Sequence, residues 1–419
     1  MTELLSRRAG ALGPHVPTFY TDPVHIVRGE GCWLWDADGA RYLDCYNNVA
    51  HVGHCHPRVV EAIARQAATL NTHTRYLHEG VVSLVERLSA LFETAQQAIL
   101  VCTGSEANDI ALRMAQAATG KRGLIATDAT YHGNTAAVSQ LSTRRPPIGG
   151  YGDHIRHVPA PTTLTPLGGT MERQGEAFAA EIRRAIAELE ESGAGFAGFM
   201  VCPIFANEGL PDLPDDFLAP AAAAVRDGGG LLIADEVQSG FGRTGRHMWA
   251  HGWMGITPDV TTLGKPMGNG HPVAACLARP DIMAAFRGAF GYFNTFGGNP
   301  VSCAAAHATL DVIEGEGLMA HAAGMSPRVV DALAGTDFGA EANVRGRGHF
   351  YAVELTRDGA PAADLAAWLM EELRRRGVLL GTIGPDRNIL KLRPPMPFGE
   401  EHLDHLMTTL KKALSACPI

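Results

Sequence analysis

The sequence predicts an α/β protein with a mostly parallel central sheet and a second, smaller α/β domain. From about residue 98, apolar strand-like runs alternate with amphipathic segments, which is typical of a parallel sheet covered by helices on both faces. The 419 residues exceed the size at which one hydrophobic core normally keeps growing. The last hundred or so residues change in character, and we expect them to form the smaller domain together with the N-terminal stretch.

Short apolar runs mark the expected strands of the large sheet. These runs are residues 98–102, 123–127, 198–205 and 231–236. Helices are expected at 106–118, after the first run, and in alanine-rich segments near 62–68, 219–225 and 303–308. Ligands bind beyond the carboxyl ends of the strands in such sheets, so the polar residues that follow these runs are candidates for a site.

The C-terminal part of the chain predicts a different arrangement. A helix over 361–376 is followed by the run GVLL, a Gly-Pro turn, NILKLRPP and a terminal helix over 400–416. We therefore expect residues 1–55 to be the N-terminal part of the small domain, 56–300 the large domain, and 301–419 the C-terminal part of the small domain.

Composition excludes several classes of partner. The 35 basic and 44 acidic residues give a formal charge of -9, which opposes attraction to nucleic acid. No uncharged apolar run approaches membrane-spanning length, and the start MTELLSRRAG has no apolar signal segment behind its arginines. We expect a cytoplasmic protein that binds neither nucleic acid nor membrane.

The cysteines and clustered histidines do not predict a metal site. The eight cysteines never form a CxxC pair, so neither a zinc ribbon nor a disulfide framework is indicated. His51, His54 and His56 match no common zinc spacing, and we expect them to make buried hydrogen bonds instead.

One lysine differs from the others. The only lysines are Lys121, Lys265, Lys391, Lys411 and Lys412. Lys265 follows a short apolar run and lies between Gly and Pro in a glycine-rich loop, whereas Lys121, Lys411 and Lys412 are expected at the surface. A lysine amine can form an imine with a cofactor aldehyde and then shuttle a proton. Lys265 is the candidate for that role.

Three other features precede Lys265 in the order that such a cofactor would need. Asp235 ends an apolar strand and could pair with a pyridine nitrogen, although a strand-end Asp is more often a helix cap or a turn residue. Gly104 and Ser105 open a helix and could bind a phosphate, although this is also an ordinary capping sequence. Tyr131 could stack on a ring or belong to the core.

Three motifs place these residues in a known context. DEVQSGFGRTG from Asp235, GKPMGNGHP around Lys265 and NTFGGNP from Asn294 closely resemble the class III (ω-) aminotransferases, which depend on pyridoxal 5'-phosphate (PLP). The resemblance extends from VRGEGCWLWDADGARYLD to KLRPP. It implies the fold-type-I PLP transferase fold and a homodimer with its sites at the subunit interface.

The resemblance also implies roles for individual residues. Lys265 would carry PLP, Asp235 would pair with the ring nitrogen, and Thr295 would reach the phosphate from the partner subunit. The residues expected to bind the cofactor are Gly104, Ser105, Tyr131, His132, Asp235, Val237, Gln238, Lys265 and Thr295.

Within the family, the chain resembles enzymes that catalyse two different reactions. Segments such as CYNNVAHVGHCHP and LNTHTRYLH resemble the ethanolamine-phosphate and phosphohydroxylysine phospho-lyases, which eliminate phosphate and ammonia. They resemble alanine-glyoxylate-type transaminases less closely. The alternatives are therefore a phospho-lyase for a phosphorylated amino alcohol and an ω-amine transaminase that uses pyruvate or glyoxylate. A third hypothesis is a binding protein that has lost the chemistry.

Two departures from the transaminase pattern favour the lyase. Many ω-transaminases grip carboxylates with an arginine before x-x-P-P, where this chain has Lys391. The stretch FANEGL places Asn207 where they carry a gateway glutamate, unless a one-residue slip restores Glu208.

A phosphate leaving group requires several cations or donors around it. The candidates for contacting substrate are Tyr20, Arg75, Lys391 and Arg393. Arg75 could instead stabilise a dimer interface, and Arg393 could pair with a surface acid.

Overall fold

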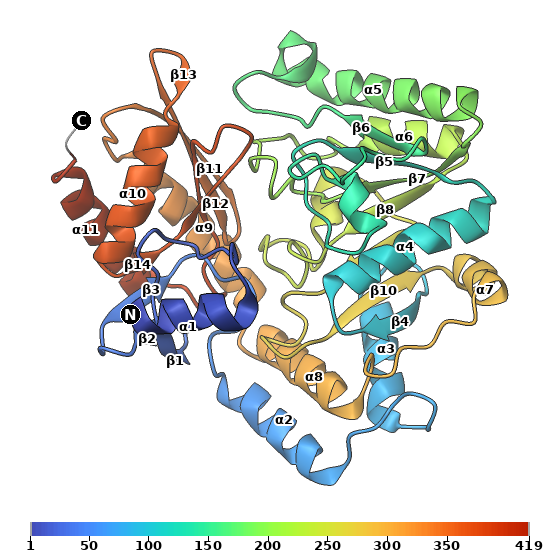
Figure 1. The fold of residues 1–419 in the computed structure, drawn as a ribbon, viewed down its shortest axis with the longest axis horizontal. Coiled ribbons are helices and arrows are strands. Elements are labelled where there is room, and N and C mark those ends of the chain that lie inside the picture. Colours follow the sequence, from blue (N-terminus) through green and yellow to red (C-terminus); the bar gives the residue numbers. More distant parts are fainter. Residues whose placement is uncertain (1, 418–419) are drawn as a thin grey trace.

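The computed structural model describes residues 2–417 and shows two lobes (Figure 1). The middle of the chain builds the larger lobe, and elements from both ends build the smaller one. The expected α/β class, with a small domain assembled from both termini, is confirmed. None of the helices within residues 2–417 has both the length and the apolar composition needed to cross a lipid bilayer.

The larger lobe is organised around a seven-stranded sheet. Its strands, in spatial order, are β4 (Gln97–Val101), β10 (Ala274–Ala278), β9 (Val260–Leu263), β8 (Leu231–Asp235), β7 (Phe196–Val201), β5 (Gly123–Thr127) and β6 (Ile155–Val158). β10 runs antiparallel to both of its neighbours, and the pairs from β9 to β6 are parallel. The expectation of a mostly parallel sheet is therefore confirmed.

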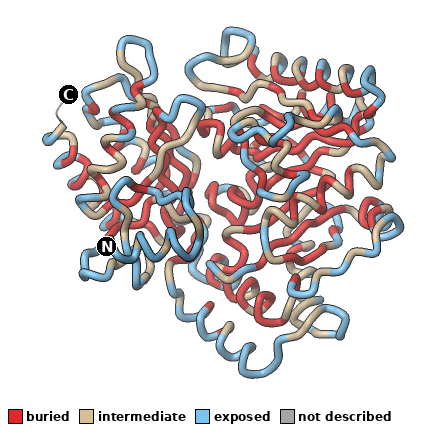
Figure 2. Tube along the Cα trace, viewed as in Figure 1, coloured by how far each residue is buried: buried red, intermediate tan, exposed pale blue. Residues whose placement is uncertain are grey.

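Helices cover both faces of this sheet, which explains why most of its strand residues are apolar and buried. One face packs on α4 (Gly104–Thr119) and α7 (Pro280–Ala289). The other packs on α5 (Met171–Glu191) and α6 (Ala219–Asp227). Figure 2 shows the strands buried between these layers. A further group consists of α2 (Pro57–Thr69), α3 (Glu79–Ser89) and α8 (Pro300–Gly315), with α2 and α3 packed on α8.

The smaller lobe contains two sheets. The first has the order β1 (Ile26–Glu30), β2 (Trp33–Asp36), β3 (Arg41–Asp44) and β14 (Val378–Leu379), in which β14 pairs in parallel with β3 and so joins the two ends of the chain. The second has the order β11 (Glu341–Arg347), β12 (Phe350–Arg357), β16 (Ile389–Leu392) and β15 (Gly381–Ile383), with β13 (Ala360–Pro361) beside β12. The helices are α1 (Thr2–Leu12), α9 (Leu318–Ala334), α10 (Ala363–Arg375) and α11 (Glu400–Leu414).

Several element ends differ from the sequence expectation. The strand expected at 198–205 is Phe196–Val201, because the chain turns after it and the Phe205 amide donates to the Cys202 carbonyl. The helix expected over 361–376 spans Ala363–Arg375, and the terminal helix stops at Leu414. The domain boundaries near residues 55 and 300 stay a prediction.

A buried polar cluster connects the lobes. Arg243, in the loop after β8, donates to the carbonyls of His349 (3.1 Å) and Pro394 (2.8 Å). The His51 ring donates to the Phe241 carbonyl at 2.8 Å, and the His349 ring bonds the Tyr351 hydroxyl at 2.9 Å. Burial lowers the pKa of His349 to about 3, helped by the Arg243 charge, and the same two causes hold the pKa of His51 well below its usual value. Both rings are therefore neutral in the fold.

These neutral histidines make stability depend on pH. In the unfolded chain they protonate near pH 6.5, but in the fold they do not, so the stabilisation is complete above pH 6.5 and is lost as pH falls. We expect a loss of about 1.4 kcal/mol per pH unit per histidine below pH 6.5. His349→Asn should reduce that slope, measured by urea denaturation of the cofactor-free protein between pH 7 and pH 5. An unchanged slope in this variant would contradict the assignment.

Candidate active site

A cavity of about 300 Å³ lies at the carboxyl ends of β4, β8 and β9. Eight of the nine residues expected to bind a cofactor line it, namely Gly104, Ser105, Tyr131, His132, Asp235, Val237, Gln238 and Lys265. Thr295 does not. The parallel strands end at the same edge of the sheet, so residues far apart in the sequence converge there.

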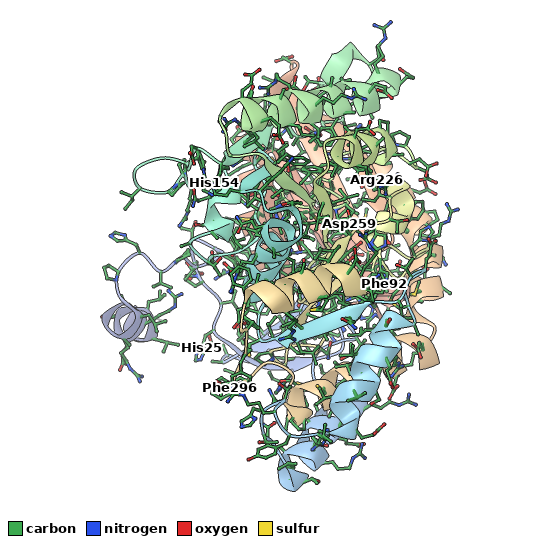
Figure 3. All side chains as sticks on the ribbon, turned by 90° about the vertical axis from the view of Figure 1, so that its right-hand side faces the viewer. His25, Phe92, His154, Arg226, Asp259 and Phe296 are labelled. Atoms are coloured by element: carbon green, nitrogen blue, oxygen red, sulfur yellow. The ribbon has the colours of Figure 1, made fainter. Side chains whose placement is uncertain are left out.

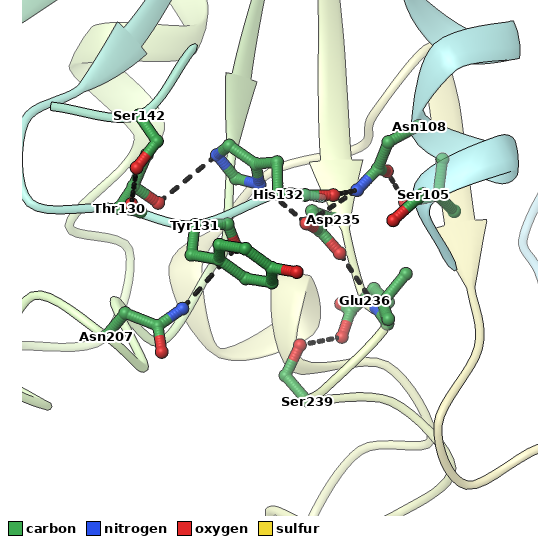
Figure 4. Close-up of polar contacts among 12 residues, drawn as sticks. Ser105, Asn108, Thr130, Tyr131, His132, Ser142, Asn207, Asp235, Glu236 and Ser239 are labelled. Carbon is green, nitrogen blue, oxygen red and sulfur yellow. Dashed lines mark hydrogen bonds and ion pairs between the residues drawn. The ribbon is translucent and has the colours of Figure 1, made fainter. Parts of the chain in front are cut away.

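Asp235 is a buried carboxylate with several donors. Its Oδ2 accepts from the His132 Nδ1–H at 2.6 Å and from the Asn108 amide at 3.0 Å, while Oδ1 accepts from the Val237 N–H at 3.0 Å. Burial raises the pKa of Asp235, but the contact with His132, the Lys265 charge and the Val237 N–H outweigh it and hold the pKa below its usual value. Figure 4 shows the Asp235 contacts with His132 and Asn108. Asp235 is therefore ionised at neutral pH.

The turn between β4 and α4 is suited to an anion. Thr103 caps α4 in a reciprocal arrangement with Glu106, which directs the first turn of the helix. Gly104 has no room for a side chain, since a Cβ there would lie 2.6 Å from Val237 Cγ1. Gly133 is equally restricted, because a Cβ there would lie 2.6 Å from Ser105 Oγ. Backbone amides at a helix N-terminus that is free of bulky side chains form a phosphate site.

Lys265 follows β9 and lies on the cavity wall. Its backbone N–H donates to the Val237 carbonyl at 3.0 Å, which ties its loop to the loop after β8. Burial lowers the pKa of Lys265; the Asp235 charge opposes this shift, and the Arg393 charge adds to it. The amine therefore loses its proton more easily than an exposed lysine does.

Tyr131, which follows β5, and Asn207, which follows β7, both line the cavity. Tyr131 is 39% exposed, and its carbonyl accepts from the Asn207 side chain at 3.5 Å. Glu208 is buried and turned away, because its carboxylate accepts from the Thr127 hydroxyl at 2.8 Å and from the Asn207 N–H at 3.0 Å. Of the two residues considered for the gateway position, the one that lines the cavity is Asn207.

Two of the expected substrate contacts lie behind Gln238. Lys391 and Arg393 both donate to Gln238 Oε1; Lys391 also bonds the Ala206 carbonyl, and Arg393 Nε donates to the Tyr46 carbonyl at 2.6 Å. Both side chains are buried, and neither lines the cavity.

The other expected substrate contacts lie elsewhere in the chain. Tyr20 donates to the Leu380 carbonyl at 2.9 Å and borders a separate cavity of about 660 Å³ near the N-terminus. Arg75 is exposed, with its guanidinium 3.9 Å from the centre of the Phe293 ring. Thr295 is also exposed, and its neighbour Phe296 lies at the surface in Figure 3. A substrate contact by Tyr20 or Arg75, and a contact of Thr295 with the cofactor phosphate across a dimer interface, stay predictions.

Comparison with known proteins assigns the family. The model of the family "Aminotransferase class-III" matches residues 17–414. This chain belongs to the class III aminotransferase family. Among curated relatives, an "Alanine--glyoxylate aminotransferase 2-like" protein of Drosophila melanogaster is 38% identical, over 99% of this chain and 87% of that protein. An "Ethanolamine-phosphate phospho-lyase homolog 1" of Caenorhabditis elegans is 34% identical, over 99% and 93%.

A solved structure gives a third comparison. A phospholyase from Arthrobacter in complex with phosphoethanolamine has a TM-score of 0.94 and 41% identity, over 99% of this chain and 100% of that one. Together these relatives make this class III member an enzyme, either a lyase or a transaminase, and set aside the reading as a binding protein without chemistry.

The structure adds residues that the motifs of this class III chain did not single out. Asn108 and Thr262 are fully buried and hydrogen-bonded to one another at 2.6 Å, and Asn108 contacts Asp235. Asn108 ends the segment TGSEAN, so its position was visible in the sequence, but its partners on other strands were not. Cys202 and His271 also line the cavity.

The three clustered histidines have separate partners. His51 bonds the Phe241 carbonyl (2.8 Å), His54 the Asp44 carboxylate (2.7 Å), and His56 the Glu316 carboxylate (3.1 Å). Each ring therefore has its own hydrogen bond, as expected, but only that of His51 is buried; the contact of His54 is partly buried and that of His56 is exposed, so the expectation of buried bonds was wrong for His56.

Packing around Gly104 yields a test of the cavity wall. Gly104→Ala should lower the free energy of unfolding by about 1–3 kcal/mol, because the added Cβ must displace Val237. Combining it with Val237→Ala should cost less than the sum of the single changes, since the second change vacates the space. Urea denaturation of the four proteins measures this coupling.

A matched control is Gly288→Ala in α7, where nothing lies within 4 Å of the added Cβ. It should leave stability unchanged or raise it by up to about 1 kcal/mol. Strictly additive effects of the Gly104 and Val237 changes would contradict the packing argument.

Proposed function

We propose that this protein is a PLP-dependent phospho-lyase that releases phosphate and ammonia from a phosphorylated amino alcohol such as O-phosphoethanolamine. The observation that carries the proposal is the convergence of Lys265, Asp235 and the Gly104–Ser105 turn in one cavity. The similarity over 99% of the chain to a phospholyase that binds phosphoethanolamine supports the choice of reaction.

The residues present fit PLP. The Ser105 hydroxyl and the amides of the α4 N-terminus suit its phosphate, Asp235 suits a protonated ring nitrogen, and Lys265 suits the aldehyde. Tyr131 and Val237 would pack against the ring, and His132 would act through Asp235. When bound, the cofactor supplies an electron sink for the carbon that loses its proton.

Lys265 has two roles in this proposal. Its amine holds the cofactor until the substrate amine replaces it, and the freed amine then takes the proton from the amine-bearing carbon. Because burial lowers the pKa of Lys265, the amine is available as a base nearer neutral pH. Asp235 remains ionised and keeps a proton on the ring nitrogen opposite it.

The leaving phosphate would be stabilised by basic groups that lie behind Gln238. Arg393 uses Nε and Nη1 for internal bonds, and no partner for its Nη2 occurs within residues 2–417, so this amino group can donate to an anion. Lys391 has two of its donor positions in use, and burial holds its pKa well below its usual value, so it offers one further bond and not a full charge. Tyr20 stays a candidate contact.

We further propose a homodimer in which the partner copy completes the site. Thr295 and Arg75 are exposed on segments that also present apolar side chains, among them Phe296 (71% exposed) and Tyr76 (67% exposed). Burial of these rings against a second copy would bring cationic and hydroxyl groups to the neighbouring cavity. The cytoplasmic location expected from the sequence also stays a prediction.

The second candidate function is an ω-amine transaminase that uses pyruvate or glyoxylate. The similarity to the Drosophila aminotransferase 2-like protein favours it. A transaminase must also accept a carboxylate-bearing second substrate in the same cavity. Here Glu208 is held by Thr127 and the Asn207 N–H, so it is not placed to pair with and release a cation on the cavity wall.

One assay separates the two functions. With O-phosphoethanolamine as the only substrate, the lyase should release phosphate and ammonia continuously without any keto acid. With an ω-amine and pyruvate, a transaminase should form alanine. Both products are measured on the same PLP-loaded preparation, and a strict requirement for the keto acid would exclude the lyase.

The role of Lys265 is tested by substitution. Lys265→Ala should remove the absorbance band of the lysine-bound cofactor and reduce turnover by about 10³-fold or more, since both the attachment point and the base are lost. Lys121→Ala is the matched control, because Lys121 forms a surface ion pair with Glu190 at 2.8 Å. Borohydride reduction followed by peptide mapping should label Lys265. A label on another lysine would refute the proposal.

A further inference from the structure

Asn108 occupies a position that links four segments of the cavity. It lies on α4, and its side chain is fully buried. Its Nδ2 donates to the His132 carbonyl at 2.6 Å and to Asp235 Oδ2 at 3.0 Å. Its Oδ1 accepts from the Thr262 hydroxyl on β9 at 2.6 Å. The amide thus connects the phosphate-turn helix, the segment after β5 and the ends of β8 and β9.

The ionised Asp235 and the His132 carbonyl decide which way this amide points, because both groups can only accept. The Nδ2 hydrogens therefore face Asp235 and His132, and the Thr262 hydroxyl donates its one hydrogen to Oδ1 on the other side of the amide. The opposite orientation would place an amide oxygen against a carboxylate and a carbonyl in a buried site. Thr262 is itself held opposite Asp235, because the two are paired in register between parallel β8 and β9.

The contacts leave the two oxygens of Asp235 unequal. Oδ2 accepts two bonds, from His132 and Asn108, whereas Oδ1 accepts one, from the Val237 N–H. Oδ1 therefore keeps the accepting capacity that a ring N–H requires. Each donor to the ionised carboxylate also makes it a weaker base. A proton shared between Asp235 and a pyridine nitrogen is therefore biased toward the nitrogen.

We infer that Asn108, held at its amide oxygen by Thr262, is a positioning residue that directs Asp235 Oδ1 at the cofactor and keeps the shared proton on the ring nitrogen. The inference rests on the proposed binding of PLP at Lys265. Asn108 and Thr262 would affect the reaction through Asp235, without touching the substrate.

The test uses Thr262→Val and Thr262→Ser as a matched pair. Valine keeps the shape of threonine but removes the hydroxyl that bonds Asn108 Oδ1 and holds the amide in place, whereas serine keeps the hydroxyl. We expect kcat of Thr262→Val to fall about tenfold, with KM changed less than about threefold, because the loss concerns the proton on the ring nitrogen and not substrate binding. Thr262→Ser should stay within about threefold of the wild type.

A spectroscopic readout separates positioning from a structural role. The absorbance of PLP bound at Lys265 is titrated with pH, and the affinity of the cofactor-free protein for PLP is measured. Weaker protonation of the ring nitrogen reduces its repulsion of the proton on the Lys265 nitrogen. The midpoint of the titration should therefore rise in Thr262→Val and in Asn108→Ala, but not in Thr262→Ser. PLP affinity should fall in the same two variants.

The outcomes distinguish this inference from the proposed function. A wild-type protein without the PLP band overturns the proposed function and the inference with it. A wild-type band, with Thr262→Val and Asn108→Ala titrating as the wild type does, overturns the inference alone. If Asn108→Ala does not fold, the titration of Thr262→Val decides by itself.

Discussion

The site depends on one buried negative charge. Asp235 lies at the end of a central strand, where an isolated carboxylate would cost several kcal/mol or take up a proton. The bonds from His132, Asn108 and the Val237 N–H offset that cost and keep the group ionised. Each donor comes from a different segment of the large lobe, so Asp235 stays ionised only when these segments meet at the end of β8.

Two buried basic residues near the cavity are held by a neutral acceptor instead of a carboxylate. Lys391 and Arg393 are buried without a hydrogen-bonded carboxylate among the residues described, and they share the oxygen of Gln238. That sharing fixes the Gln238 amide, so its NH₂ group is the part left to donate elsewhere. The guanidinium of Arg393 places a positive charge behind Gln238, which suits an anionic substrate. Burial and the neighbouring positive charges hold the pKa of Lys391 well below its usual value.

The two lobes are joined by contacts that bear on the same site. Arg243, eight residues after Asp235, bonds the carbonyl of Pro394, which directly follows Arg393. The loop that starts at Asp235 therefore also holds the strand end that carries Arg393. This arrangement couples the position of the smaller lobe to the edge of the cavity and leaves the chemical centre in the larger lobe.

The sequence by itself determined the fold class, the family and the eight lining residues from Gly104 to Lys265. Each of these eight residues lies in a short motif at or just after the end of a strand, and the carboxyl ends of the strands meet at one edge of the sheet. Tertiary structure decided the rest. It placed Lys391 and Arg393 behind Gln238, put Tyr20 at a separate cavity, and selected Asn207 over Glu208 on the wall. It also revealed Asn108 and Thr262 as partners. Those outcomes depend on contacts between segments that are 76 or more residues apart, and on competition for buried hydrogen bonds, neither of which a local pattern records.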